Sequence, residues 1–376
     1  MTKKENSSEE TGKKLGVIRF TFYSVVILAN VFVSLCTLVG KASCFINPSN
    51  FVIPSYLGLA FPYLLLIHVG FLIFWAIKKK AYILISIITL IICYSETRRT
   101  FSIGHDHRAE GDTLSITSYN VQMFQYFATI DKNKTLEYVM NCGSDVVCLQ
   151  EFGFCNARWH LTEEDLKAEL QKEYKYIHYN ETLLDWNAHT GVAILSKHPI
   201  INKGKVDYES EHNGAIYADI LFKGDTIRVF SCHLESNKLT EEEKKVLNDM
   251  KKAKASKEEA NNVVSSVSTK MNNSYKMRAE QAEKVGEYVH NTPYPIILCG
   301  DFNDVPVSYT YHSVKGDKLI DAFRECGSGY GYTYNKKLFH FRIDQIMHSK
   351  EGKAIQFKVG DVKYSDHYPI SCKIVF

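Results

Sequence analysis

Long apolar runs and short alternating runs divide the chain into two unlike parts. Before Glu96, three stretches at residues 18–39, 51–77 and 81–95 are almost continuously apolar. After Glu96, apolar residues come in short runs separated by polar and turn-forming residues, as in the strands of a globular domain. The pattern predicts a membrane-associated N-terminal region followed by a domain large enough for one extensive core.

The apolar stretches predict membrane-spanning helices. The first is long enough to cross the hydrocarbon layer and no close cleavage pattern follows it, so we expect it to be retained. With three spans, the basic tail at residues 1–17 and the lysines at 78–80 lie in the cytoplasm, and the C-terminal domain lies outside it. The third stretch is short, so the alternative is two spans, with this stretch at the membrane interface and a cytoplasmic domain.

A domain at residues 113–376 is expected to follow a linker at residues 96–112. Its strand-like runs lie at residues 114–119, 145–149, 192–195, 215–222, 226–232, 296–299, 343–347 and 371–376. Helical stretches are expected at residues 133–140, 163–173 and 240–290. The turn residues Lys223, Gly224 and Asp225 predict a hairpin, hence antiparallel pairing. We expect a layered α/β domain with two packed mixed sheets, and no glycine-rich phosphate loop occurs in the sequence.

Three further features narrow the class of protein. The segment at residues 238–276 is rich in Lys, Glu, Asn and Ser, which favours a solvated helical insertion or mobile loop over a substrate-binding arm. The cysteines after residue 96 have no regular spacing, so neither a disulfide framework nor a zinc site is indicated. The net charge of +3 does not by itself indicate a nucleic-acid-binding protein.

Acidic, amide and imidazole side chains recur where the expected strands end. Taken singly, each has an ordinary explanation as a turn residue, a helix cap or a packed histidine. Together they offer hard oxygen ligands and two histidines that titrate near neutrality, the groups that metal-assisted phosphoester hydrolysis requires. The residues at these positions are Asn120, Glu151, His233, Asp301, Asn303, Asp344, Asp366 and His367.

The ordered motifs resemble the endonuclease/exonuclease/phosphatase superfamily, which has the deoxyribonuclease-I-like fold. The resemblance covers about residues 114–376. It rests on Asn120, Gln150-Glu151, His233-Leu234, Gly300-Asp301-Phe302-Asn303, Arg342-Ile343-Asp344 and Ser365-Asp366-His367. It implies a four-layer α/β/β/α sandwich with the active site at one edge of the two sheets. The N-terminal apolar region lies outside the match and is similar to that of membrane-anchored bacterial members, which implies an inner or plasma membrane location.

The resemblance also implies a metal site. Glu151 would be the principal ligand of Mg²⁺, with Mn²⁺ as the alternative ion. Asp366 and Asn120 would complete the site directly or through water, since magnesium is usually held by one or two carboxylates and keeps several waters.

Catalytic roles follow in the same way from the resemblance. His367 would act as the general base, oriented by Asp344, while Asp301 and Asn303 would position the nucleophile and the phosphoryl oxygens. His233 would donate a hydrogen bond or a proton toward the phosphate or the leaving group. The assignment of the base between Asp301 and His367 stays open.

Substrate contacts are less well indicated by the sequence. Asn213, which precedes an expected strand, and the arginines Arg158 and Arg342 are the candidates for contacting a phosphate. The resemblance implies hydrolysis of phosphodiester or phosphomonoester bonds, in nucleic acid or in a phospholipid or inositol-phosphate head group. The lipid bilayer is the other expected partner, and no protein partner is indicated. The alternative is an inactive binding or scaffold module on the same fold, which the complete set of competent residues disfavours.

Overall fold

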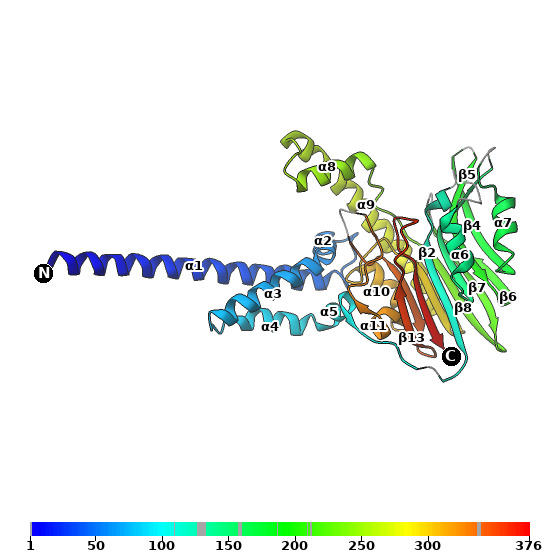
Figure 1. Cartoon of the computed structure of the whole chain (residues 1–376), viewed down its shortest axis with the longest axis horizontal. Coiled ribbons are helices and arrows are strands. Elements are labelled where there is room, and N and C mark those ends of the chain that lie inside the picture. Colours follow the sequence, from blue (N-terminus) through cyan, green and yellow to red (C-terminus); the bar gives the residue numbers. More distant parts are fainter. Residues whose placement is uncertain are drawn as a thin grey trace.

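The computed structural model describes residues 2–108, 110–125, 133–156, 160–185, 187–208, 210, 213–336 and 340–376. A helical N-terminal region leads into a layered α/β domain, and α1 extends away from that domain (Figure 1). The N-terminal helices are α1 (Thr2–Ala42), α2 (Ile53–Leu59), α3 (Phe61–Ile77), α4 (Ile83–Ile92) and α5 (Tyr94–Thr100).

One N-terminal helix is long and apolar enough to cross a membrane. This segment, Leu15–Ala42, has a mean hydropathy of 2.2, and many of its apolar side chains are exposed. The pair α2 and α3 could form a second span only as a bent unit, because their axes differ by 64°. The third apolar stretch is divided, and α4 contains ten residues, which rise only about 15 Å against a hydrocarbon layer of about 30 Å. Three membrane-spanning helices are therefore not supported.

The N-terminal helices contact the α/β domain directly. The Ser43 hydroxyl donates to the Val307 carbonyl at 2.9 Å, and Asn47 Nδ2 donates to Glu283 Oε1 at 2.9 Å. Val307 also joins a buried cluster with Phe61 and Leu65 of α3. Residues 96–112, expected as a linker, contain most of α5 as well as β1 (Ser102–Ile103), which pairs with β11 (Ser328–Gly329). The two parts of the chain are thus joined by a packed interface.

Two six-stranded mixed sheets form the centre of the domain, as expected. The first sheet has the order β10 (Leu319–Asp321), β12 (Asp344–Ser349), β9 (Ile296–Asp301), β8 (Asp225–His233), β7 (Gly214–Phe222) and β6 (Ile200–Lys205). The second has the order β13 (Lys353–Val359), β14 (Ile370–Val375), β2 (Thr113–Asn120), β3 (Val146–Cys155), β5 (Ala188–Ser196) and β4 (Tyr176–Asp185). Each contains one parallel pair, β8 with β9 and β2 with β3, among antiparallel neighbours.

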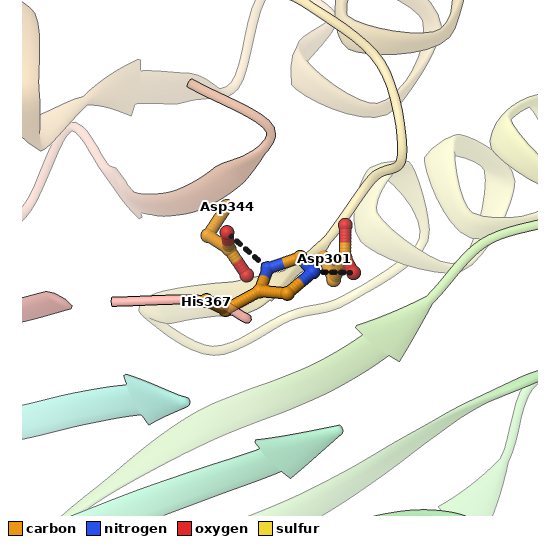
Figure 2. Close-up of side chains that lie close together, drawn as sticks. All are labelled: Asp301, Asp344 and His367. Atoms are coloured by element: carbon orange, nitrogen blue, oxygen red, sulfur yellow. Dashed lines mark hydrogen bonds and ion pairs between the residues drawn. The ribbon is translucent and has the colours of Figure 1, made fainter. Parts of the chain in front are cut away.

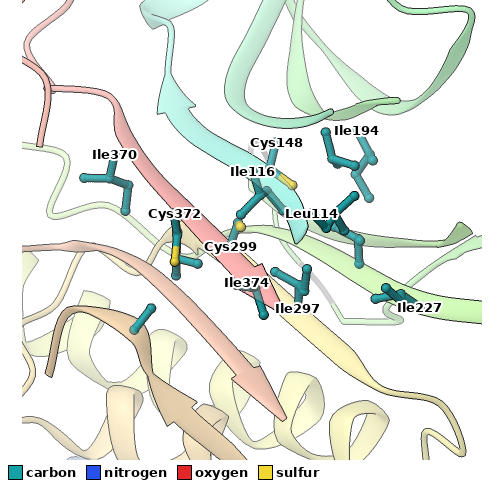
Figure 3. Close-up of a cluster of buried hydrophobic side chains, with 14 of the residues drawn as sticks. Leu114, Ile116, Cys148, Ile194, Ile227, Ile297, Cys299, Ile370, Cys372 and Ile374 are labelled. Atoms are coloured by element: carbon teal, nitrogen blue, oxygen red, sulfur yellow. The ribbon is translucent and has the colours of Figure 1, made fainter. Parts of the chain in front are cut away.

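The core lies between the two sheets. Inward-facing aliphatic side chains alternate along the strands, and three cysteines, Cys148, Cys299 and Cys372, are packed among them as small buried groups (Figure 3). All ten cysteines are free thiols, in agreement with the irregular cysteine spacing. The hairpin at Lys223 and Gly224 is present, and both residues have the positive φ angles that its turn requires.

Helices cover the outer face of each sheet. Leu136 of α6 (Lys134–Asn141) and Leu166 of α7 (Glu163–Leu170) pack on the second sheet. Val285 of α9 (Lys257–His290) and Tyr311 of α10 (Tyr309–Lys315) pack on the first sheet. Two short helices, η1 (Gln122–Gln125) and α11 (Ala322–Cys326), complete the described elements.

The polar segment at residues 238–276 forms a helical arm. It comprises α8 (Glu241–Lys251) and the first half of α9, and capping boxes at Thr240 and Ser256 begin the two helices. The arm projects from the domain on the side where α2 lies (Figure 1). We refer to residues 238–273 as the α8–α9 arm.

Candidate active site

The two parallel strand pairs end at the same edge of the sandwich and bring the polar residues together. In the second sheet Asn120 is level with Gln150, so Asn120 lies next to Glu151. In the first sheet His233 is level with Asp301, and Asp301 is also level with Asp344. Strand register therefore places residues from distant parts of the sequence around one point.

Asn120 links the two sheets at this point. Its Nδ2 donates to Glu151 Oε1 and to Asp301 Oδ2, each at 3.1 Å. Glu151 lies at an irregularity between Gln150 and Phe152 and has a positive φ of 48°. Such a bulge turns a side chain out of the regular pleat, and here the Glu151 carboxylate is partly exposed on a cavity. Burial raises the pKa of Glu151 despite its hydrogen bond from Asn120.

Asp344, His367 and Asp301 form a buried chain of charged groups (Figure 2). His367 Nδ1 lies 2.8 Å from Asp344 Oδ2, and His367 Nε2 lies 3.6 Å from Asp301 Oδ2. Burial opposes protonation of His367, but the two carboxylates outweigh it and raise the pKa of the imidazole well above its usual value. Burial raises the pKa of Asp301 to about 6, although His367 and His233 act in the opposite direction. These opposing influences suit a site that exchanges protons.

His233 and Asn303 complete this side of the site. His233 is 5% exposed, and its Nε2 lies 3.8 Å from Asp301 Oδ2 without a hydrogen-bond partner among the described residues. Burial lowers the pKa of His233. Asn303, at a positive φ of 50°, donates from Nδ2 to the Leu234 carbonyl, and it lines the cavity. Both residues therefore lie beside the charged chain, and the hydrogen bond to the Leu234 carbonyl holds the Asn303 side chain there.

A family model decides how this arrangement is classified. The model described as Endonuclease/Exonuclease/phosphatase family matches residues 117–367, which include every residue of the charged chain. The chain belongs to this family. A second model, a domain of unknown function (DUF8431), matches residues 23–100 and so covers most of the N-terminal helices. No curated protein sequence matches the chain.

The chain is similar to several solved structures over about 70% of its length. An endonuclease/exonuclease/phosphatase from Beutenbergia cavernae has a TM-score of 0.50 at 15% identity, covering 70% of this chain and 71% of the other. D. rerio TDP2 complexed with a single-strand DNA product gives 0.48 at 18% identity, covering 70% and 100%. The mannosyl-6-phosphatase Bt3783 from Bacteroides thetaiotaomicron gives 0.44 at 17% identity, covering 70% and 100%. At these identities the similarity concerns the fold alone.

The strand-end residues of this endonuclease/exonuclease/phosphatase family member come together at one site, whereas the described candidates for substrate binding do not join them. Arg342 is 2% exposed, binds Asp321 at 2.8 Å and the carbonyl of Arg99 at 3.0 Å, and does not line the cavity over the site, which does not support the expected contact with a phosphate. Asn213 lies directly before the start of β7 and donates to Glu235 Oε2 at 2.8 Å. Arg158 lies outside the described residues.

A cavity of about 880 Å³ opens over the site. Glu151, Asp301, Asn303, Asp366 and His367 lie on its floor. Its other walls come from the α8–α9 arm, from α2, and from Tyr334, Lys336, Phe341 and Ile343. The sequence favoured a solvated insertion for residues 238–276, whereas the structure places part of this segment against the active site.

Two contributors to the family site carry no recognisable sequence signal. The Thr333 hydroxyl accepts hydrogen bonds from the backbone N–H groups of Ile343 and Asp344, both at 3.1 Å, and so fixes the start of β12. The Tyr334 ring packs edge-on against His367 at 5.3 Å between ring centroids. Both residues come from an irregular segment, where no strand or helix pattern indicates the direction of a side chain.

The donor set suits a hard divalent cation. Glu151 and Asp366 present partly exposed carboxylates to the same cavity, and the charge of Asp366 contributes to the raised pKa of Glu151. A cation between two such carboxylates would relieve this repulsion, and oxygen donors are the ligands that Mg²⁺ prefers. Asp301, Asp344 and His367 also offer ligand atoms within 4.8 Å of one another. Both groups border the cavity, and the pair Glu151 and Asp366 differs in that it contains only carboxylates and is partly exposed.

Proposed function

We propose that the chain is a membrane-anchored, Mg²⁺-dependent phosphoesterase that hydrolyses phosphodiester or phosphomonoester bonds. The main support is the meeting of the Asn120–Glu151 pair with the chain of Asp344, His367 and Asp301 below one cavity. Membership of a family described as endonucleases, exonucleases and phosphatases agrees with this chemistry. The long apolar segment of α1 supports the membrane anchor.

Glu151 and Asp366, with Asn120 beside them, are the residues proposed to hold Mg²⁺, with Mn²⁺ as the alternative ion. A bound ion of this kind supplies positive charge that stabilises the charge developing on the phosphoryl oxygens. The small net charge of the chain is compatible with a phosphate substrate for this reason.

In the proposed reaction, a water oxygen forms a bond to phosphorus while the bond between phosphorus and the ester oxygen breaks. The Asp301–His367 pair takes the proton that the water loses, Asp344 holds His367 in place, and Asn303 positions the water. His233 Nε2 donates a hydrogen bond toward the phosphoryl group or the leaving oxygen, and the leaving oxygen gains its proton from the Asp301–His367 pair or from solvent. The products are an alcohol and a phosphate or phosphomonoester.

Hydrolysis assays on the full chain in detergent micelles or nanodiscs would test this proposal. Soluble phosphomonoesters and phosphodiesters would be incubated with Mg²⁺, with Mn²⁺ and with chelator, using wild type, Glu151→Gln and His367→Ala. His178→Ala is a matched control, because this half-buried histidine contacts the Gly204 carbonyl outside the cavity.

We expect the wild-type chain to hydrolyse the esters, chelation to abolish this activity, and added Mg²⁺ to restore it. Glu151→Gln and His367→Ala should be inactive, whereas His178→Ala should keep the wild-type rate. If wild type and both site variants gave the same rates on every ester, the phosphoesterase proposal would be wrong. Binding of phosphate esters without turnover would instead favour an inactive binding module on the same fold.

A further inference from the structure

The cavity above the catalytic residues has an apolar wall that hydrolysis of a phosphate does not require. We propose that the α8–α9 arm and α2 form a binding site for the apolar chain of an amphiphilic phosphoester, so that the substrate is a lipid phosphate ester and not a nucleic acid. This inference rests on the proposed function, because the catalytic residues are the floor of the same cavity.

The apolar wall consists of side chains that are only partly buried. Leu239, Leu247, Val267 and Met271 from the arm line the cavity, and Leu59 from α2 lines it as well. The four arm residues belong to none of the buried hydrophobic clusters in the described chain. Their exposure to water is unfavourable unless a ligand covers them, because burial of apolar surface is favourable roughly in proportion to its area.

This wall suits a hydrocarbon chain better than a nucleic acid. Proteins that bind single strands without sequence preference present exposed aromatic rings on which bases stack. Here the arm contributes aliphatic side chains, which offer no stacking surface. Of the aromatic residues in the cavity, Phe341 is 9% exposed and Tyr334 packs against His367.

Lysines accompany the apolar residues along the arm. Lys244, Lys245 and Lys252 of the arm line the cavity, and Lys244 pairs there with Glu241 at 2.8 Å. Lys336 also lines the cavity, with its Nζ 3.9 Å from Asp366 Oδ2. Positive charge of this kind favours an anionic ester and the anionic surface of a bilayer. The cavity therefore combines a basic rim, an apolar wall and a phosphoester-cleaving floor.

The position of α2 connects this cavity with the membrane region. The Tyr56 hydroxyl of α2 donates to Asn272 Oδ1 of the arm at 2.7 Å, and the Tyr56 ring packs against Tyr275. Helix α2 ends at Leu59, and α3 begins directly afterwards at Phe61. In α3 the side chains of Leu66 and Ile73 are 60% and 57% exposed. In Figure 1 the arm and α2 lie on the side of the domain from which α1 and α3 extend. Leu59 of the apolar wall therefore lies just before the start of α3, which links the proposed lipid site with the membrane region.

Paired substrates that differ only in the apolar chains test this inference. The full chain, reconstituted in phosphatidylcholine vesicles, would receive phosphatidic acid and phosphatidylglycerol, the soluble counterparts glycerol 3-phosphate and glycerophosphoglycerol, and a single-stranded DNA oligonucleotide. The test variant combines Leu247→Ser with Met271→Ser. Val264→Ser is the matched control, because Val264 is 47% exposed on the same arm and does not line the cavity.

We expect kcat/KM to be higher for the lipid esters than for their soluble counterparts. The double variant should lower the ratio of the two kcat/KM values by about tenfold or more, while the control keeps it within about twofold. Faster hydrolysis of the oligonucleotide or of the soluble esters, or an equal loss on all substrates in the double variant, would overturn the lipid site and leave the phosphoesterase intact. No hydrolysis of any ester with Mg²⁺ would contradict the proposed function itself.

Discussion

The catalytic centre and the α8–α9 arm border the same cavity but are built in opposite ways. At the centre, Asp301 and His367 are almost completely buried and are fixed by strand register and by several polar neighbours. The arm is half-exposed and is held by capping boxes and a few polar contacts. The reacting groups are thus held by the strands of both sheets. The cavity wall proposed to select the substrate belongs to a separate helical element with fewer contacts to the rest of the domain.

Asp344 should show the largest effect on activity. Asp344→Asn would remove the charge that orients His367 and supports its protonated form, with little change in shape. We expect kcat to fall by about 10²–10⁴-fold, with an unchanged circular dichroism spectrum. A fall of less than about threefold on every hydrolysed ester would show that the charged chain is not part of catalysis.

Arg342 should affect the free energy of unfolding and not the chemistry. Arg342→Ala would leave the carboxylate of Asp321 buried without its partner, at a cost of about 3–5 kcal/mol. Thermal or denaturant unfolding would measure the loss, and the rate per folded molecule would stay close to that of wild type. A selective rise in KM with normal stability would instead return Arg342 to the substrate site.

Glu243 connects the two helices of the arm. Its carboxylate accepts hydrogen bonds from Ser266 and Thr240 and pairs with Lys270 at 2.8 Å, and these partners outweigh burial and lower the pKa of Glu243 to about 2. Because the folded pKa is depressed, this stabilisation is complete above the usual glutamate value and is lost as the pH falls from about 4.5 to 2.

Glu243→Gln should therefore loosen the arm, by about 1–2 kcal/mol at neutral pH. Hydrogen exchange would report faster exchange in residues 241–273, while β8 and β9 keep their protection. At about pH 2 and below, the variant and wild type should converge. Equal protection of the arm in both proteins at pH 7 would contradict the view that the arm depends on these contacts.

Ser256 should give the smallest effect. Ser256→Ala removes the N-cap of α9, whose hydroxyl accepts from the Glu259 N–H at 3.2 Å. Loss of such a cap costs about 1 kcal/mol, and it should fray only the exposed start of α9. Protease cleavage near residue 256 is the readout, with no change in the melting temperature of the sandwich.

The sequence could predict the two-sheet domain and the residues at its edge, because buried strands leave clear apolar runs and each run ends in a polar motif. It could not indicate β4 or β6, since strands with mainly half-exposed or exposed residues, such as Ile200–Lys205, lack that alternation. Arg342 lies within a family motif, yet the direction of its side chain depends on contacts with Asp321 and Arg99 that are remote in sequence.

The arm shows the same limit of prediction from sequence. Its composition is that of a solvated helix, and most of its surface is indeed exposed to solvent. Its remaining face becomes a wall of the active site only because α2 and residues such as Tyr334 and Phe341 lie around the same cavity. Likewise, α4 is shorter than the apolar stretch that contains it, because α4 ends before Cys93 and a separate helix, α5, begins after it.

Asn120 has a mechanical consequence for the whole domain. Its single amide group holds one carboxylate from each sheet, so the distance between the two sheets sets the spacing of the reactive groups. The core side chains between the sheets, including Cys148 and Cys299, determine this distance. A substitution that reduces the volume of these core side chains would let the two sheets move closer together. The protein would still fold, but the distances between the reactive groups would change and the rate of catalysis would fall. The catalytic rate should therefore depend on the distance between the two sheets.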